Sequence, residues 1–481
     1  MAQKSKQLEL PLGQGGESRR TQRSEQTSTA TTGNGGLGTR TLMEEVVDGR
    51  NIKRAAKRVR SNKGAPGIDG MKVDELDGWM REHWPGVREQ LLAGTYEPSP
   101  VRRVMIPKRG GGERELGIPT VSDRLIQQAL LQVLQRYIDP TFSEYSYGFR
   151  PGRSAHDAVA QMRDYVVEGR EWVVDIDLEK FFDRVNHDIL MGRLAKRIED
   201  RRVLRVIRRY LGAGVMVDGV KVVRDDGTPQ GGPLSPLLAN VYLDEVDKLL
   251  EARGHAFVRY ADDLRVLVRS RRAGERVMRG LVKRFGKLRL KVNESKSTVA
   301  RVTDRPFLSF TLWVDKDGKI RIRVASKALN AMKERVREVT KKTRGRAVGQ
   351  VVAELRRYLI GWRGYFGYTD VPTELTGIEG WIRRRVRCLI LYQYRNPRRA
   401  YRALRELGAS DRVAKKIAAN LRHWWRNSRG SVHYVLTNSY LARLGVPPLV
   451  TCPQAFEPPG ADPHARWCGR GGRGDPAPLS R

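Results

Sequence analysis

The amino-acid sequence predicts an α+β fold, in which a region of mixed helices and strands is followed by a helical region. Up to about Ala325, short apolar runs bounded by turn-forming residues indicate strands and hairpins, with helical segments between them. Beyond Ala325 the strand pattern stops, and apolar residues recur at helical spacing. The chain has 481 residues, 40% of them hydrophobic, which is enough for roughly two to four domains with cores of their own.

The chain is strongly basic, with 91 Lys and Arg against 54 Asp and Glu and a formal net charge of +37. An excess of this size favours a polyanionic partner. An anionic membrane surface is the alternative. However, the basic residues are spread over the whole chain, and no apolar run is long enough to cross a membrane. Nucleic acid is therefore the expected partner, and no membrane association is expected.

The three cysteines, Cys388, Cys452 and Cys468, are too few and too widely spaced for a disulfide framework or a paired zinc motif. The first residues contain no apolar signal core. Both observations predict a protein of the reducing cytoplasm.

The N-terminal part begins with residues 1–40, whose Gln, Ser, Thr and Gly content predicts disorder. A basic helical pattern follows at residues 42–60 and is interrupted by the turn formers of residues 63–70. That loop is either an ordinary turn or a loop close to a phosphate backbone. A further helix is expected at about residues 73–92.

Residues 101–108 and 114–119 are predicted to form two strands joined by glycines, with basic side chains on both flanks. In a polymerase such a hairpin would grip template and triphosphate, whereas a plain surface hairpin would carry solvated Lys and Arg. An amphipathic helix is expected at residues 123–134, with Ser122 as its N-cap.

The segment 147–156 places Arg150 and Arg153 between Gly and Pro residues at an expected helix start. Two arginines there could meet an anion, because the helix N-terminus adds its own donors. Further along, the Gly/Pro loop 227–236 leads into an apolar helix. Its glycines would let the backbone approach a base pair, with Gln230 as a polar reader, and an ordinary capped helix start is the alternative.

Two acidic segments carry the strongest chemical signal. Residues 172–183 contain Asp177 near the end of an apolar strand, and residues 257–267 contain Asp262 and Asp263 at the turn of a predicted hairpin. A solvated Asp-Asp turn is the simple alternative, because Asp is common in turns. Carboxylates at the end of apolar strands are costly to desolvate unless a cation or hydrogen bonds compensate them. A divalent metal ion is the economical explanation.

Nucleotidyl transfer needs two divalent ions roughly 4 Å apart, one at the attacking 3′ hydroxyl and one on the triphosphate. Asp177 and Asp262 are the candidates to bridge the two ions, and Asp263 would support the second ion or the primer end. Ligands that are all oxygen favour Mg²⁺, with Mn²⁺ as a substitute.

The C-terminal part is helical and basic. Residues 351–366 show one wet and one buried helix face, for which core packing is a sufficient explanation. Residues 381–443 contain 16 Lys and Arg but only two acidic residues, interleaved with aromatic rings. Such a surface suits folded RNA, whose phosphates are neutralised and whose unstacked bases lie on rings. From Thr451 on, Pro and Gly predict a loose tail.

The residues at 177–182, 227–231, 260–263 and 293–296 occur in the order of reverse transcriptase motifs. The Tyr-Ala-Asp-Asp form, the 147–154 segment and the basic region from Trp381 resemble the bacterial group II intron reverse transcriptase/maturase family, over about residues 42–450. The resemblance implies a right-hand polymerase followed by a maturase domain. Its parts are a disordered segment (1–40), fingers (41–165), a palm with an antiparallel sheet and interleaved fingers elements (166–322), a helical thumb (323–375), the maturase RNA-binding domain (376–450) and a loose tail (451–481).

The resemblance also implies roles for individual residues. Asp177, Asp262 and Asp263 match the catalytic, metal-binding aspartates, and the backbone of Ile176 or Leu178 would add a metal ligand. Phe182 matches the residue that stacks under the incoming sugar and excludes a ribose 2′ hydroxyl, and Gln230 lines the nascent base pair. The expected nucleotide contacts are Lys108, Arg114 and Lys296. Lys296 either protonates the pyrophosphate leaving group or is an ordinary surface lysine. The expected RNA contacts are Arg150, Arg153, Arg383, Arg384, Arg385, Arg387, Arg398, Arg399, Lys415, Lys416 and Trp424.

The resemblance implies a bacterial, cytoplasmic protein that binds its group II intron RNA, promotes splicing and copies the intron into DNA during retrohoming. Target DNA with a primer and dNTPs would be the other partners, and a monomer and a homodimer are both compatible with the sequence. A maturase that only binds RNA and a reverse transcriptase that serves its host are the alternatives. All three aspartates are present, which argues against the first, and the region from Trp381 to Leu449 argues against the second.

Two departures from the family pattern are visible. Ser309 stands where the family usually has glycine in a turn beside the primer, and serine there would hinder a positive-φ backbone. Cys452, His464 and Cys468 are too few and unsuitably spaced for the family's optional DNA endonuclease. We therefore expect no endonuclease, and insertion that is primed from a nick or a replication fork.

Overall fold

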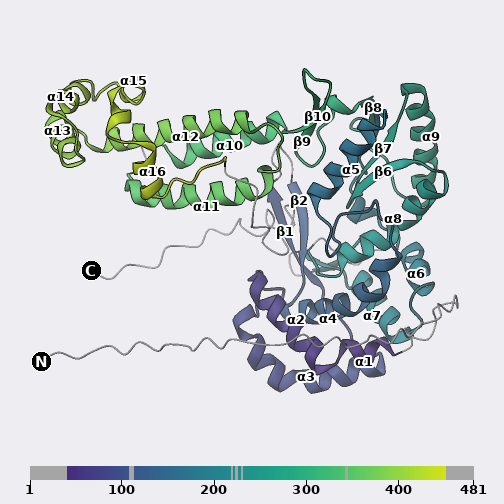
Figure 1. The fold of residues 1–481 in the computed structure, drawn as a ribbon. Coiled ribbons are helices and arrows are strands. Elements are labelled where there is room, and N and C mark those ends of the chain that lie inside the picture. The colour runs from purple at the N-terminus through teal and green to yellow at the C-terminus, as the bar shows by residue number, and fades with distance from the viewer. Residues whose placement is uncertain are drawn as a thin grey trace, which may run out of the picture.

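The structure is a computed structural model that describes residues 41–107, 113–217, 220–222, 226–228, 231–341 and 345–450. The expected disorder of residues 1–40 and the tail after Val450, with Cys452, His464 and Cys468, lie outside the described residues. Lys108 and Gln230 lie outside them as well. The described chain contains both helices and sheets, which confirms the predicted α+β class (Figure 1).

An N-terminal helical lobe is built from α1 (Leu42–Val46), α2 (Gly49–Asn62), α3 (Leu76–Ala93), α4 (Val121–Ile138) and α7 (Arg201–Gly212). The single helix predicted for residues 42–60 is in fact two. Asp48 interrupts it and caps α2 by accepting hydrogen bonds from the amides of Arg50 and Asn51. Likewise, the N-cap of α4 is Thr120 rather than Ser122, because the Thr120 hydroxyl accepts from the Asp123 amide.

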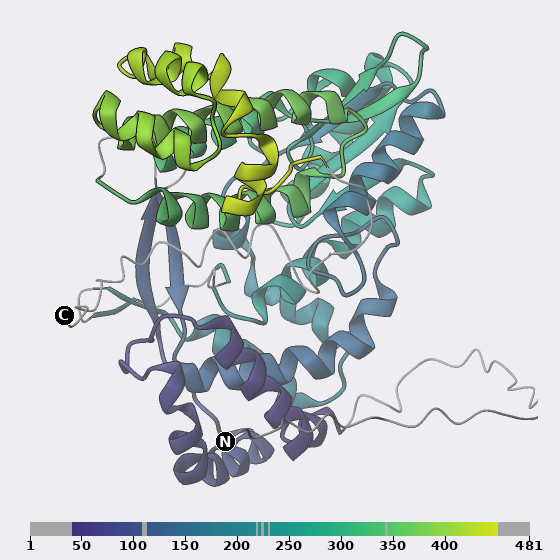
Figure 2. The same ribbon diagram turned by 60° about the vertical axis from the view of Figure 1, so that its left-hand side comes forward.

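The predicted hairpin at residues 101–119 is confirmed as the antiparallel pair β1 (Val101–Pro107) and β2 (Glu113–Ile118). It belongs to a four-stranded sheet of order β2-β1-β4-β5, with β4 (Val215–Val217) parallel to β1 and β5 (Val220–Val222) at the edge. In Figure 2 this sheet stands between the N-terminal lobe and the C-terminal helices.

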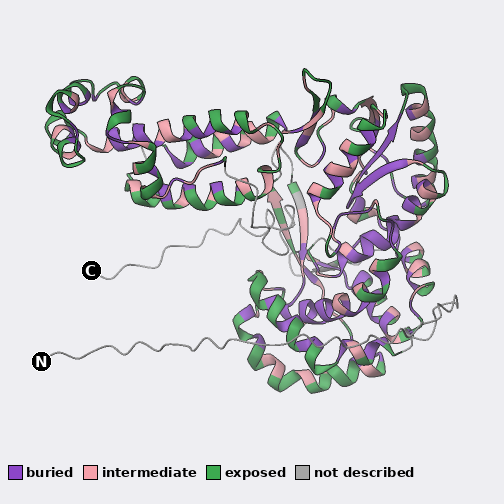
Figure 3. Ribbon diagram, in the orientation of Figure 1, coloured by how far each residue is buried: buried purple, intermediate pink, exposed green. Residues whose placement is uncertain are grey.

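The palm sheet has the order β6-β7-β3-β8, and every neighbouring pair is antiparallel. Its strands are β3 (Trp172–Ile176), β6 (Ala256–Tyr260), β7 (Asp263–Val268) and β8 (Thr298–Arg301). The helices α8 (Ser235–Ala252) and α9 (Arg271–Lys287) and the helix α5 (Ala155–Val167) pack against it. The central strands β3 and β7 are therefore buried along most of their length, as the purple strands of Figure 3 show.

The two faces of the palm sheet enter two different cores, because side chains alternate along each strand. Val174, Ile176 and Val266 join the core of the N-terminal lobe, α8 and α9. Val173 and Leu267 point the other way and join a core formed with α5 and the C-terminal helices. The sheet thus connects the two halves of the molecule.

After the hairpin of β9 (Phe310–Val314) and β10 (Ile320–Val324), the described chain is helical, as predicted for the region beyond Ala325. Figure 1 shows α10 (Ser326–Val339), α11 (Val348–Phe366) and α12 (Pro372–Gln393) extending side by side away from the palm. The remaining helices are α6 (His187–Ala195), α13 (Pro397–Glu406), α14 (Asp411–Ala419), α15 (Trp424–Asn427) and α16 (Asn438–Leu444), with short 3₁₀ turns at Val73–Glu75, Asp139–Thr141, Phe181–Arg184, Val302–Asp304 and Ser431–Tyr434.

Among the described helices, none is both long enough and apolar enough to cross a membrane.

Candidate active site

Asp262 and Asp263 lie at the turn between β6 and β7, as the sequence predicts. The register pairs Tyr260 with Asp263, so that Ala261 and Asp262 form a two-residue hairpin loop. Ala261 has a φ of +57°, in the left-handed region that favours glycine. The loop leaves Asp262 exposed and Asp263 partly buried at the start of β7.

Strand β3 brings Asp177 to the same end of the palm sheet. Ile176 pairs with Leu264 in the antiparallel register, and Asp177 is the next residue along the chain. The register therefore brings Asp177 to the level of Asp263, on the strand face that also carries Asp175. Residues that are far apart in the sequence thus meet at one end of the central strands.

The charges at this end of the sheet are only partly compensated. Burial raises the pKa of Asp263 to about 6, and the neighbouring Asp175 and Asp262 add to the shift while Arg265 opposes it. Arg265 lies between two carboxylates, with Nε 3.1 Å from Asp263 Oδ1 and Nη1 2.7 Å from Asp175 Oδ2. Lys296 Nζ lies 3.6 Å from Asp177 Oδ2. Negative charge gathered in this way fits a site that takes up a cation.

The donor set also fits a hard metal ion, because Asp177, Asp262 and Asp263 offer only oxygen ligands. Across the described residues, no three acidic, His or Cys side chains are arranged as a ready-made metal cluster. The Asp177 carbonyl is engaged by the Asn293 amide at 2.8 Å. The carbonyls of Ile176 and Leu178 stay predicted metal ligands.

The predicted sugar-contacting residue, Phe182, is half-buried beside Phe181, with ring centroids 5.1 Å apart in an edge-on arrangement. Its carbonyl accepts a hydrogen bond from the Thr228 amide at 2.7 Å. This bond attaches the start of the Gly/Pro loop that contains Gln230 to the Phe182 segment. Arg114 is in β2, opposite Ile106, and its nucleotide contact stays a prediction, as does that of Lys108.

Ser309 adopts the positive-φ backbone conformation that is expected where the family usually has glycine. Its φ is +67°, and the preceding Leu308 also has a positive φ of +48°. The Ser309 carbonyl accepts a hydrogen bond from the Ala325 amide at 2.9 Å, which holds the turn against the start of α10. Serine therefore occupies a position in which glycine would be relaxed.

Arg150 and Arg387 are interior structural residues, contrary to the prediction that they contact RNA. Arg150 is 9% exposed, pairs with Asp139 and donates to the carbonyls of Ser143 and Ser146. Arg387 is 2% exposed and donates to the Leu436 carbonyl at 2.7 Å. Both guanidinium groups find acceptors inside the protein, as buried charged groups must.

The other predicted RNA contacts lie at or near the surface of the helical module from α12 onwards, apart from Arg153, which precedes α5 and donates to the Glu144 carbonyl. Arg384 stacks on Trp425, with its guanidinium carbon 3.7 Å from the ring centroid. Trp424 instead packs edge-on against Tyr392. The rest are exposed or half-buried: Arg383, paired with Glu379; Arg385, bonded to Thr340; Arg398; Arg399; Lys415, paired with Asp411; and Lys416.

The sequence interpretation missed Arg259, which lies in β6 only three residues before Asp262. It is 2% exposed and forms an ion pair with the fully buried Asp247 of α8, with Nη2 2.6 Å from Oδ2. One signal in the sequence could have revealed it: Arg259 is a charged residue within the otherwise apolar run of residues 256–260. A charge in a buried strand almost always has a partner, so a buried ion pair could have been expected.

A palm sheet with an acidic turn, joined to a basic helical module, is the arrangement expected of a template-directed nucleic-acid polymerase. Two family models agree with this class. Residues 106–312 match "Reverse transcriptase (RNA-dependent DNA polymerase)", and residues 329–408 match "Group II intron, maturase-specific domain".

Relatives support the same conclusion. The chain is 32% identical to Protein YkfC of Escherichia coli over 296 residues, which cover 53% of this chain and 77% of YkfC. It is 40% identical to the group II intron-encoded protein LtrA of Lactococcus lactis over 197 residues, 41% of this chain and 33% of LtrA. The chain belongs to the group II intron-encoded reverse transcriptase/maturase family. Among solved structures, 42% of one chain of a partial Cas6-RT-Cas1–Cas2 complex aligns with 51% of this one at 26% identity and a TM-score of 0.34.

Proposed function

We propose that the protein is an RNA-directed DNA polymerase and maturase that binds its group II intron RNA, promotes splicing and copies the intron into DNA during retrohoming. The observation that carries the proposal is the register of β3, β6 and β7, which brings Asp177 to the aspartate turn on a chain that also has a maturase domain. Its substrates would be the intron RNA, a DNA primer at the target site and dNTPs.

The proposed chemistry is nucleotidyl transfer with two Mg²⁺ ions. When bound, Mg²⁺ lowers the pKa of the primer 3′ hydroxyl and neutralises the charge of the triphosphate. Asp177 and Asp262 would bind both ions, with Asp263 beside them. Lys296 is 67% exposed and close to Asp177, which suits a residue that gives a proton to the departing pyrophosphate. Phe182 would lie under the sugar.

Primer extension on an RNA template tests the proposal. Asp262→Ala should reduce DNA synthesis to background, because one ligand of both ions is lost, while binding and splicing of the intron RNA persist. The matched control is Asp317→Ala, which removes an exposed aspartate from the turn between β9 and β10. Equal synthesis by wild type and Asp262→Ala would overturn the polymerase assignment. Loss of splicing in both aspartate variants would point to misfolding.

A further inference from the structure

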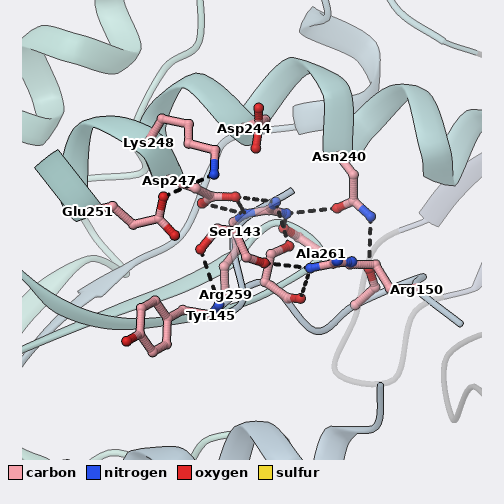
Figure 4. A network of polar contacts seen from close by, with 12 residues as sticks. Ser143, Tyr145, Arg150, Asn240, Asp244, Asp247, Lys248, Glu251, Arg259 and Ala261 are labelled. Carbon is pink, nitrogen blue, oxygen red and sulfur yellow. Dashed lines mark hydrogen bonds and ion pairs between the residues drawn. The ribbon is translucent and has the colours of Figure 1, made fainter. Parts of the chain in front are cut away.

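We propose that Arg259, held by Asp247 of α8, is a positioning residue that sets the geometry of the aspartate turn. This inference rests on the proposed function, because it assigns Arg259 a role through the aspartates that would bind metal. It concerns the network in Figure 4, where Arg259 lies among side chains and carbonyls from three segments of the chain.

Every N–H donor of the Arg259 guanidinium has an acceptor. Nε lies 2.8 Å and 3.0 Å from the two carboxylate oxygens of Asp247, and Nη2 donates to Asp247 at 2.6 Å and to Ser146 Oγ at 2.7 Å. Nη1 donates to Asn240 Oδ1 at 2.9 Å and to the Ala261 carbonyl at 2.8 Å. The planar fork with five donors is specific to arginine.

The bond to the Ala261 carbonyl is the link to the active site. Ala261 is the first residue of the two-residue loop, and its peptide continues directly into Asp262. Its positive φ is unfavourable for alanine and persists only where surrounding contacts determine the conformation. The bond from Arg259 fixes the carbonyl end of that residue, so the direction in which the chain enters Asp262 depends on it.

A second contact fixes the other side of the loop. A Cβ added to Gly148 would lie 2.2 Å from the Ala261 nitrogen, so the 145–148 segment packs directly on the turn. Asn240 ties this segment to the network, because its Nδ2 donates to the Gly148 carbonyl at 2.9 Å while its Oδ1 accepts from Arg259 (Figure 4). The turn is thus held between Gly148 and Arg259, and both are anchored on α8.

The principal test is Arg259→Lys, which keeps the charge but cannot form the fork. Asp247→Asn is the second variant, because it keeps the shape of the carboxylate. Both should lower kcat for primer extension by about 100-fold, as expected when reacting groups are misplaced by about 1 Å. The midpoint of Mg²⁺ activation should rise, with the dNTP KM and the affinity for intron RNA unchanged. Mn²⁺ binding to the protein on a template-primer duplex, followed by the EPR signal of free Mn²⁺, should weaken in parallel.

Asp244→Asn is the matched control. Asp244 lies one turn before Asp247 on α8 and is also a buried carboxylate paired with an arginine, but its partner Arg197 lies outside the turn. A purely structural role would lower the active fraction equally at all Mg²⁺ concentrations and leave the midpoint unchanged. Ser146→Ala is a milder variant for the case in which the larger changes impair folding. It removes a single acceptor of Arg259 and should raise the Mg²⁺ midpoint by a smaller amount.

The inference is overturned if Arg259→Lys and Asp247→Asn match Asp244→Asn in both Mg²⁺ midpoint and Mn²⁺ binding. That result, together with an inactive Asp262→Ala, would leave the proposed function intact. If Asp262→Ala is as active as wild type, the proposed function itself fails and the positioning role fails with it.

Discussion

Gly148 lies against the peptide of Ala261, where a methyl group has no room. Because the atoms it would meet are backbone atoms of the aspartate turn, Gly148→Ala must shift either the turn or its own segment. We expect destabilisation of about 1–3 kcal/mol, typical of overpacked positions, and a larger loss of primer extension than this stability change explains. Thermal unfolding and primer extension at a temperature where the protein stays folded would separate the two effects.

The matched control is Gly192→Ala in α6, where an added Cβ would meet nothing within 4 Å. This change should leave activity unaltered and stabilise the helix by up to about 1 kcal/mol. If Gly148→Ala and Gly192→Ala have the same stability and the same primer-extension activity, the close approach of Gly148 to the aspartate turn does not matter for function.

Ser309 stores backbone strain at a turn beside the palm. Since a left-handed conformation costs an L-residue about 1–2 kcal/mol, Ser309→Gly should relieve it, although the added freedom of the unfolded chain returns about 0.4–1 kcal/mol. The net gain should lie between about 0 and about 1.6 kcal/mol. Ser309→Val should lower the melting temperature, because β-branched residues tolerate a positive φ least. A Val variant as stable as the Gly variant would show that this turn rearranges freely.

At the level of elements, α12 carries both structural and surface arginines. Arg387 faces the interior and donates to the Leu436 carbonyl and to Asn438 Oδ1, which holds the segment that leads into α16. Arg387→Met would leave the buried Leu436 carbonyl without this donor, at a cost of about 1–3 kcal/mol. The loss at Asn438 should be small, because that residue is exposed and water can replace the arginine. We expect a lower melting temperature, measured by calorimetry, for Arg387→Met.

Arg398 at the start of α13 is exposed and offers the converse case. Arg398→Met should change stability by no more than about 0.5 kcal/mol and should weaken intron RNA binding, measured by filter retention. If Arg398→Met destabilised the protein as much as Arg387→Met, the division between structural and surface arginines would be wrong.

The sequence predicted well where a pattern was local. The hairpin of β6 and β7 follows from alternating apolar residues around a turn, and the end of strand structure at Val324 follows from the change of periodicity. It did not predict the burial of Arg150, Arg387 or Arg259, because the acceptors of these side chains lie on other elements. Whether Asp139 meets Arg150, or Asp247 of α8 meets Arg259 of β6, depends on how these elements pack in the folded chain.

At the scale of the whole molecule, the palm sheet belongs to two cores at once. One face packs with the N-terminal lobe and the other with the C-terminal helices, so the aspartate turn lies at a boundary between the two. Interactions made by the C-terminal helices can therefore influence the palm through packed side chains such as Val173 and Leu267. This arrangement joins the proposed polymerase site and the maturase domain in one structural unit.

The net charge of +37 predicts how the whole protein binds RNA. If many cations neutralise phosphates, the logarithm of the binding constant should fall linearly with the logarithm of salt concentration, by about 0.7–0.9 for each phosphate neutralised. Replacing Arg398, Arg399 and Lys416 with Gln should reduce that slope by about the same amount for each cation removed. Asp262→Ala should keep the wild-type slope, because it acts on catalysis. A slope near zero, or one that the three exposed substitutions do not change, would contradict RNA binding by this surface.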